Sequence, residues 1–292
     1  MADPTRSKGE NLMIEAEAML NKSGGMCCGS KARVRSEEAS MLYVKAANAF
    51  KMEKEWHKAG NAFAEAASME LKNERKTEAA MHYVEAAKCY KKVSPSECET
   101  CLLKASEVYD DVGRGKTAAK QHLALAEFCE EQGVLPRALD EYQKAADMFI
   151  EEQLASSTTK CLTSVARISA VLGDYNRAKE LYEQLGTEAL NNSLLKYTAN
   201  EHFAKAGLCH LASNPQDGKG LLQKMEEWKD TNPSFEGSRE SIFLSKLGQA
   251  VMKEDLDEFN EAIRSHESIS RLSDGDNAIL KSIRKTFGTD LC

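Results

Sequence analysis

The sequence predicts an all-α fold: a right-handed superhelix of antiparallel helix pairs, of the tetratricopeptide-like α-solenoid kind, that ends in a C-terminal helical bundle. Two observations lead to this prediction. A stripe of alanines and aromatics returns every twenty residues, and the composition favours helices. Valine and isoleucine are sparse beside alanine, leucine, lysine and glutamate. Only 5 prolines occur in 292 residues, so long helices can continue unbroken.

The repeat has the form A-x3-(Y/F)-x2-A-A. Its copies begin at Ala39, Ala59 and Ala79, return at Ala138, and recur in weaker form at Ala178. Spacings of four and three place these residues on one face of a helix. Small alanines let neighbouring helices approach closely, and each aromatic fills the space beside them. Twenty residues make one helix and a turn, so forty residues make one helix pair.

Turn signals separate the predicted helices. Ser94-Pro95 and Pro136 suit helix starts, whereas Gly113 and Gly133 suit C-terminal caps. Asn-Pro pairs at 214–215 and 232–233 end the later helices. The predicted helices span residues 12–20, 38–52, 55–72, 76–92, 96–112, 116–131, 136–150, 157–172, 175–190, 194–212, 217–230, 238–254 and 256–272.

The alanine–aromatic pattern fades after about residue 215, where larger apolar residues such as Trp228 and Phe243 take over. We therefore predict two domains. Residues 1–215 form a twisted sheet of helical hairpins that includes a mobile loop at 23–35. Residues 216–292 form the C-terminal bundle and a tail.

Composition excludes several classes of protein. Hydrophobic residues make up 42% and charged residues 29%, as in ordinary soluble proteins. No apolar stretch is long enough for a transmembrane helix, and the polar N-terminus lacks a secretory signal. Nine scattered cysteines fit reduced thiols in the cytoplasm. The net charge of −7 argues against a nucleic-acid partner.

Motifs for catalysis or cofactors are weak. Gly24, Gly29, Ser30 and Lys31 only approximate a phosphate-binding loop, because the last two residues are swapped and no strand is predicted before them. Cys98 and Cys101 form one C-x-x-C, but a structural zinc site needs four ligands. We expect no catalytic residues, no metal and no cofactor. A thiol or metal activity at this cysteine pair stays open as a minor alternative.

The glycine-rich loop also suggests membrane contact. Met26, Cys27 and Cys28 precede basic residues and could touch a bilayer weakly. The two cysteines either stay unmodified or carry S-acyl chains beside an anionic membrane.

Basic residues recur near the ends of the predicted helices. Scattered charges usually form a solvated face. In a solenoid, however, equivalent positions of successive repeats line one surface, so basic residues there can attract an acidic, elongated partner.

Several stretches resemble the soluble NSF attachment protein family. They are YVKAANAFKMEKEWHKAGNAFAEAA (43–67), AAKCYKKVSP (86–95), YDDVGRGKTAAKQH (109–122), LLKYTANEHFAKAGLCHLA (194–212) and SISRL (268–272). The similarity covers nearly the whole chain.

The resemblance implies an adaptor in vesicle trafficking and membrane fusion. Such adaptors bind the four-helix bundle of syntaxin-like and other SNAREs through a concave basic face. They then recruit the hexameric ATPase NSF, which disassembles the bundle. The SNARE-facing positions implied by the resemblance are Lys54, Lys91, Arg114, Lys120, Lys160 and Arg239.

The resemblance assigns NSF binding to the tail, where Leu291 is the penultimate residue and Asp290 is the one nearby acid. The family usually has several acids there, and Ser164 and Asn200 stand where its basic residues are common. An alternative function is therefore a helical-repeat scaffold for other protein partners with weakened or lost NSF coupling. Both readings place the protein in the cytoplasm, peripherally associated with membranes.

Overall fold

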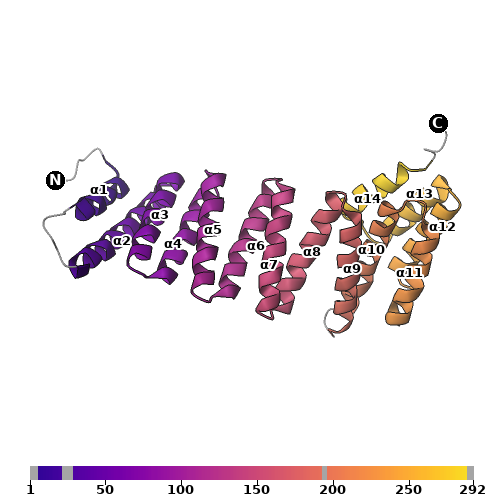
Figure 1. The fold of residues 1–292 in the computed structure, drawn as a ribbon. Helices are drawn as coiled ribbons and strands as arrows, with labels where there is room; N and C mark the ends of the chain where they lie inside the picture. The colour runs from indigo at the N-terminus through magenta and orange to yellow at the C-terminus, as the bar shows by residue number, and fades with distance from the viewer. Residues whose placement is uncertain (1–5, 22–28, 193–195, 288–292) are drawn as a thin grey trace. The chain divides into compact units, whose positions relative to one another are not determined.

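The computed structural model describes residues 6–21, 29–192 and 196–287, and these residues form helices joined by turns. The chain divides into two compact units, Met1–Thr158 and Thr159–Cys292, with the division inside α8 (Ala155–Val171). Figure 1 shows the helices in order along the chain. Among the described residues no strand occurs, so the all-α prediction is confirmed.

The first unit is a series of helices, each packed against the next. From α2 onward, connections of three or four residues make neighbouring helices antiparallel. Apart from the beginning of α8, its helices are α1 (Lys8–Asn21), α2 (Gly29–Met52), α3 (Trp56–Lys72), α4 (Lys76–Tyr90), α5 (Pro95–Asp111), α6 (Gly115–Glu131) and α7 (Leu135–Glu151). Most of the predicted boundaries are within two residues of these. Pro95 and the proline of α7 lie in first turns, as predicted.

The alanine–aromatic repeat forms the core. Ala39, Tyr43, Ala46 and Ala47 are buried, and so are their counterparts that begin at Ala59, Ala79 and Ala138. Neighbouring helices also come very close where a glycine faces an aromatic ring. A methyl group on Gly60 of α3 would lie 2.7 Å from the ring of Tyr90 on α4.

One type of turn recurs after the helices. The residue that follows the left-handed position donates its N–H to the carbonyl five residues earlier, as Val134 does to Cys129 and Leu154 does to Phe149, both at 2.9 Å. This bond closes a Schellman motif and satisfies a carbonyl at the helix end. The left-handed residues between α2 and α9 are Lys54, Glu74, Gly113, Gly133, Gln153 and Gly173, spaced by twenty except across the turn after α4, which lacks one.

The second unit packs its helices around larger side chains. The rings of Phe203, Trp228 and Phe235 contact one another, with centroids 5.3 to 5.9 Å apart. After α8 its helices are α9 (Tyr175–Leu190), α10 (Ala199–Ser213), α11 (Gly218–Thr231), α12 (Arg239–Met252), α13 (Leu256–Glu267) and α14 (Asp274–Arg284). Short 3-10 turns lie at Lys196–Thr198 and Pro233–Phe235.

Two features differ from the sequence-based predictions. Helix α2 begins at Gly29, so residues 29–35 of the predicted loop are helical. Ser36, ahead of the predicted start at 38, contacts α3, since its Oγ lies 3.7 Å from Met69 Sδ. The predicted domain boundary at 215 stays a prediction; α10 packs on α11, α12 and α14 as well as on α9.

Helix α14 is the second difference, since no helix was predicted at 274–284. Ser273 and Asp276 form a capping box at its start. Ile279, Leu280 and Ile283 are buried on one face of this helix. Those signals are present in the sequence, but they fall outside the alanine–aromatic repeat.

The left-handed turns generate a prediction about stability. Gln153 adopts a φ of 56°, which costs an L-residue about 1 kcal/mol relative to glycine. Gln153→Gly should therefore raise the free energy of unfolding by about 0.5–1 kcal/mol. Gly133→Ala should lower it by about 1 kcal/mol, because φ is 75° there and an added Cβ meets nothing within 4 Å.

Urea denaturation of each variant measures these changes. Gln153→Ala is the matched control and should leave stability nearly unchanged, since it keeps the backbone strain and alters only the side chain. Equal stabilisation by alanine and glycine would contradict a backbone origin.

Candidate protein-binding surface

The turns and ends of the helices carry three of the six implied SNARE-facing residues. Lys54 occupies the left-handed position between α2 and α3 and is exposed. Lys91 follows α4, where its Nζ lies 2.7 Å from Glu131 Oε2 and 5.8 Å from the centroid of the Phe128 ring. Arg114 is the exposed N-cap residue of α6. Lys91 therefore already has an anionic partner within the protein.

Lys120 and Lys160 occupy equivalent positions in two helices. Lys120 lies on α6, five residues before Leu125-Ala126, and Lys160 lies on α8, five residues before Val165-Ala166. Both lysines are exposed, whereas the two apolar pairs are buried. The repeat thus gives both lysines the same outward direction within their helices.

Arg239 is the first residue of α12 and is exposed. Its Nε donates to Glu240 Oε1 at 2.6 Å, and this contact raises the pKa of the guanidinium. Lys54, Lys91, Arg114 and Lys120 belong to the first unit, and Lys160 and Arg239 belong to the second. The six residues are thus distributed along the repeats of both units.

A buried carboxylate fixes α6, the helix that presents Lys120. Glu141 on α7 is fully buried; its Oε2 lies 2.7 Å from His122 Nδ1, and its Oε1 accepts from Lys144 Nζ at 2.9 Å. Burial alone would raise the pKa of Glu141, but hydrogen bonds with His122 and Lys144 outweigh burial and hold it below 4.5. Because His122 is two residues from Lys120, this contact orients the lysine's helix.

Sequence reasoning missed the Glu141 cluster. An acid in the core stripe of α7, directly before Tyr142, is the available signal, because a buried carboxylate requires partners. The identity of those partners depends on packing between helices, which the sequence pattern does not give.

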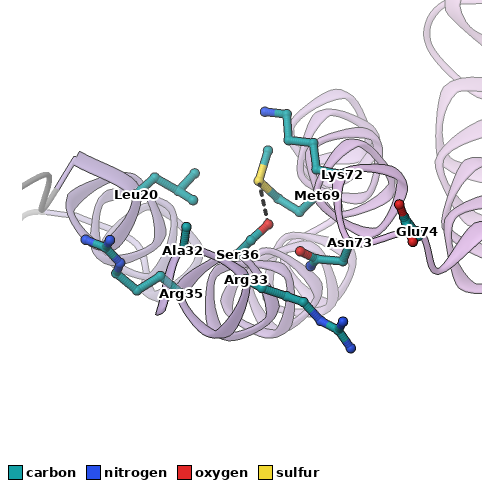
Figure 2. Close-up of a pocket in the computed structure, with 9 residues that line it drawn as sticks. All are labelled: Leu20, Ala32, Arg33, Arg35, Ser36, Met69, Lys72, Asn73 and Glu74. Carbon is teal, nitrogen blue, oxygen red and sulfur yellow. Dashed lines mark hydrogen bonds between the residues drawn. The ribbon is translucent and has the colours of Figure 1, made fainter. Parts of the chain in front are cut away.

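A hollow of about 520 Å³ lies between α1, α2 and α3. Its apolar lining includes Leu20, Ala32 and Met69, and its basic residues are Arg33, Arg35 and Lys72. Figure 2 shows the two arginines extending in different directions from α2, and Lys72 lying on α3. The three cations do not converge on one point.

Several predicted site residues lie outside the described residues. They are Met26, Cys27 and Cys28 of the membrane-contact loop and Asp290 and Leu291 of the tail. Gly29, Ser30 and Lys31 begin α2, with no strand before them among the described residues. A helix start without a preceding strand does not provide the context of a phosphate-binding loop.

Cys98 and Cys101 are buried on one face of α5. Burial raises the pKa of the Cys98 thiol to about 12 and that of the Cys101 thiol to about 11. Both thiols are therefore protonated at neutral pH, whereas metal binding and nucleophilic attack need the thiolate. Across residues 6–21, 29–192 and 196–287, no group of three histidines, cysteines or acids could hold a metal ion.

No helix in the described part of the chain is both long enough and apolar enough to cross a membrane.

Comparison with known proteins gives a family that spans both units. The family model described as soluble NSF attachment protein, SNAP, matches residues 7–288. This chain belongs to the soluble NSF attachment protein family. The human alpha-soluble NSF attachment protein is 39% identical over 284 residues, covering 96% of this chain and 94% of its own length.

More distant relatives align over similar lengths. The alpha-soluble NSF attachment protein of Vitis vinifera is 33% identical, with 98% of this chain and 96% of the relative covered. The vesicular-fusion protein SEC17 of Komagataella phaffii is also 33% identical, with 94% and 96% covered. Members of this family are adaptors, so membership supports the expectation that the chain is not an enzyme.

The Glu141 cluster generates a prediction about pH dependence. Its pKa is lowered in the folded state, so its contribution to stability is full above the unfolded value near 4.5 and is lost as the pH falls through the lower folded value. Glu141→Gln should lower the free energy of unfolding by about 2 kcal/mol at pH 7, because His122 and Lys144 lose a buried charged partner.

Urea denaturation at pH 7, and at several values below 4.5, tests both parts. The variant should lose less stability on acidification than the parent does. Glu107→Gln, at an exposed position on α5, is the matched control. An acid-induced loss as steep in Glu141→Gln as in the parent would assign the pH dependence to other groups.

Proposed function

We propose that this protein is an adaptor in vesicle fusion that binds assembled SNARE bundles and recruits and stimulates NSF for their disassembly. The family match over residues 7–288 carries the proposal, together with relatives named for NSF attachment and vesicular fusion. Catalysis then belongs to the ATPase, and this chain supplies contacts.

Exposed basic residues at repeating positions support a contact with an acidic, elongated bundle. Lys120 and Lys160 project from equivalent positions of α6 and α8, and Arg114 begins α6. An exposed ion pair contributes about 0–1 kcal/mol, so binding needs several of them. Many weak pairs suit a complex that must be dismantled, because no single contact holds it.

Lys91 takes part in a different way. Its ion pair with Glu131 has to be exchanged for a pair with the bundle, so its net contribution is smaller than that of Lys120. Lys54, in contrast, is carried on a turn with a fixed left-handed backbone, which limits the directions that its side chain can take.

The tail and the N-terminal loop complete the proposal. An apolar side chain beside a carboxylate, Leu291 next to Asp290, suits docking on a basic surface of NSF. Met26, Cys27 and Cys28 would contact the membrane weakly, with Arg33 and Arg35 of α2 nearby in sequence to attract anionic lipid. The protein would then act in the cytoplasm and associate peripherally with membranes.

The single acid in the tail KTFGTDLC favours a second candidate function. In this version the chain is a helical-repeat scaffold for protein partners, and its coupling to NSF is weakened or lost. Binding of the SNARE bundle without stimulation of NSF would support the scaffold.

The tail generates one prediction. Leu291→Ala should leave retention of the soluble SNARE bundle within about twofold of the parent but slow ATP-driven disassembly about tenfold, since truncation of an apolar anchor costs 1–2 kcal/mol. The measurement is a pull-down on the bundle followed by disassembly with NSF. Cys292→Ala is the control for a change at the chain end. Equal disassembly rates for the parent and Leu291→Ala would argue against docking through this leucine.

The basic surface generates another prediction. Lys120→Glu combined with Lys160→Glu should weaken binding to the SNARE bundle about tenfold or more at low salt, because both attractions become repulsions. The loss should shrink as salt screens the charges. Titration of the bundle at several NaCl concentrations measures both effects.

Lys104→Glu, at an exposed position on α5, is the control for net charge. This single change alters the net charge half as much as the double variant does, so half the loss in binding free energy would mean that net charge decides binding rather than the positions of Lys120 and Lys160.

A further inference from the structure

Two exposed methionines of the first unit occupy the same position of the repeat as Lys120. Met41 on α2 is 56% exposed, and Met81 on α4 is 55% exposed. Each lies two residues after a buried alanine of the repeat, Ala39 or Ala79. Lys120 stands two residues after the buried Ala118 of α6. The three side chains therefore occupy the same position of alternate helices.

Ion pairs place these alternate helices in one layer. Lys51 of α2 pairs with Glu85 of α4, with Nζ 3.4 Å from Oε2. Lys91, directly after α4, pairs with Glu131 of α6 at 2.7 Å. Met41, Met81 and Lys120 thus form one row across neighbouring helices of the same unit, which we name the methionine–lysine row.

Single exposed apolar side chains are ordinary on protein surfaces. Here, however, two of them recur at one position of the repeat and continue into a lysine. Methionine is long, unbranched and polarisable, so it adapts to an irregular partner surface. Water contact over about half of each methionine leaves apolar area available for burial in a complex.

Charges beside the methionines indicate which partner fits. Glu38 is exposed one turn before Met41, and Glu78 lies one turn before Met81, where it pairs with Arg75 at 3.6 Å. These acids disfavour an anionic bilayer directly over the two methionines, whose own contribution to binding is apolar. The ion pairs from α2 to α4 and from the end of α4 to α6 hold these three helices side by side, so a rod-shaped helical bundle can lie across them.

We propose that the SNARE bundle of the proposed function also contacts Met41 and Met81, through apolar surface that adjoins the acidic surface facing Lys120. The inference rests on the proposed function and adds an apolar component to the electrostatic contact between this protein and the SNARE bundle. The lysine part weakens with salt, whereas the methionine part does not, because apolar burial is insensitive to screening.

The test compares variants in binding to the soluble four-helix SNARE bundle from 50 to about 500 mM NaCl, a range over which screening increases several-fold. Met41→Ser with Met81→Ser should weaken binding about tenfold at every salt concentration and leave the slope against salt unchanged. Lys120→Ser should instead reduce that slope. Ile150→Ser, at a 54% exposed position on α7, is the matched apolar control and should stay within about twofold of the parent.

A second pair of variants separates binding from folding. Met41→Leu with Met81→Leu keeps the apolar surface and should bind within about twofold of the parent, while circular dichroism checks that all variants are folded. A loss of affinity in the leucine variant equal to that in the serine variant would overturn the inference, as would parental affinity in the serine variant.

Two further outcomes separate the inference from a failure of the proposed function and from membrane binding. If the parent itself does not bind the bundle, the proposed function fails and the inference fails with it. Vesicles of anionic phospholipid without SNAREs provide the other comparison. Parental binding of the serine variant to these vesicles is expected, and a loss confined to vesicles would assign the methionines to the membrane and overturn the assignment to the bundle.

Discussion

The close approach of neighbouring helices is the constraint on which the fold depends, because it leaves no room for two large side chains at one contact. Gly60 against Tyr90 and Gly186 against Phe203 show this in the two units, since a methyl group on either glycine would lie 2.7 Å from the facing ring. The alanines of the repeat are likewise small and buried. Close approach fixes the rotation of each helix about its axis, and that rotation decides which positions face outward.

The turns between the helices extend this regular arrangement along the chain. Helices α2, α3 and α5 to α8 end in the same left-handed turn, closed by the same N–H to carbonyl bond, so each starts its successor at a similar angle. Residues at equivalent positions therefore repeat their exposure. Lys120 and Lys160 follow that rule, as do Met41 and Met81. The packing of the core therefore determines which side chains form the binding surface, although none of those side chains contributes to the core.

Most of the fold was predictable from the sequence, because the repeat carries both helix length and the buried face. Predictions were poorer where packing between distant helices decides the result. Ser36, ahead of the predicted start of α2, contacts Met69 of α3, and α14 packs on α10, far from it in sequence. For the site, family resemblance supplied the lysines and arginines. The pairing of Lys91 with Glu131 and of His122 with Glu141 follows only from the packing of α6 against its neighbours.

The buried thiols carry a consequence for experiments in solution. Cys98 and Cys129 in the first unit and Cys209 in the second are enclosed between helices, and burial raises the pKa of each. An alkylating reagent reaches such a sulfur only while its helix pair is open. The labelling rate of each cysteine therefore reports how often its own unit opens. Comparing the rates of the two units would show whether they unfold independently, without any introduced probe.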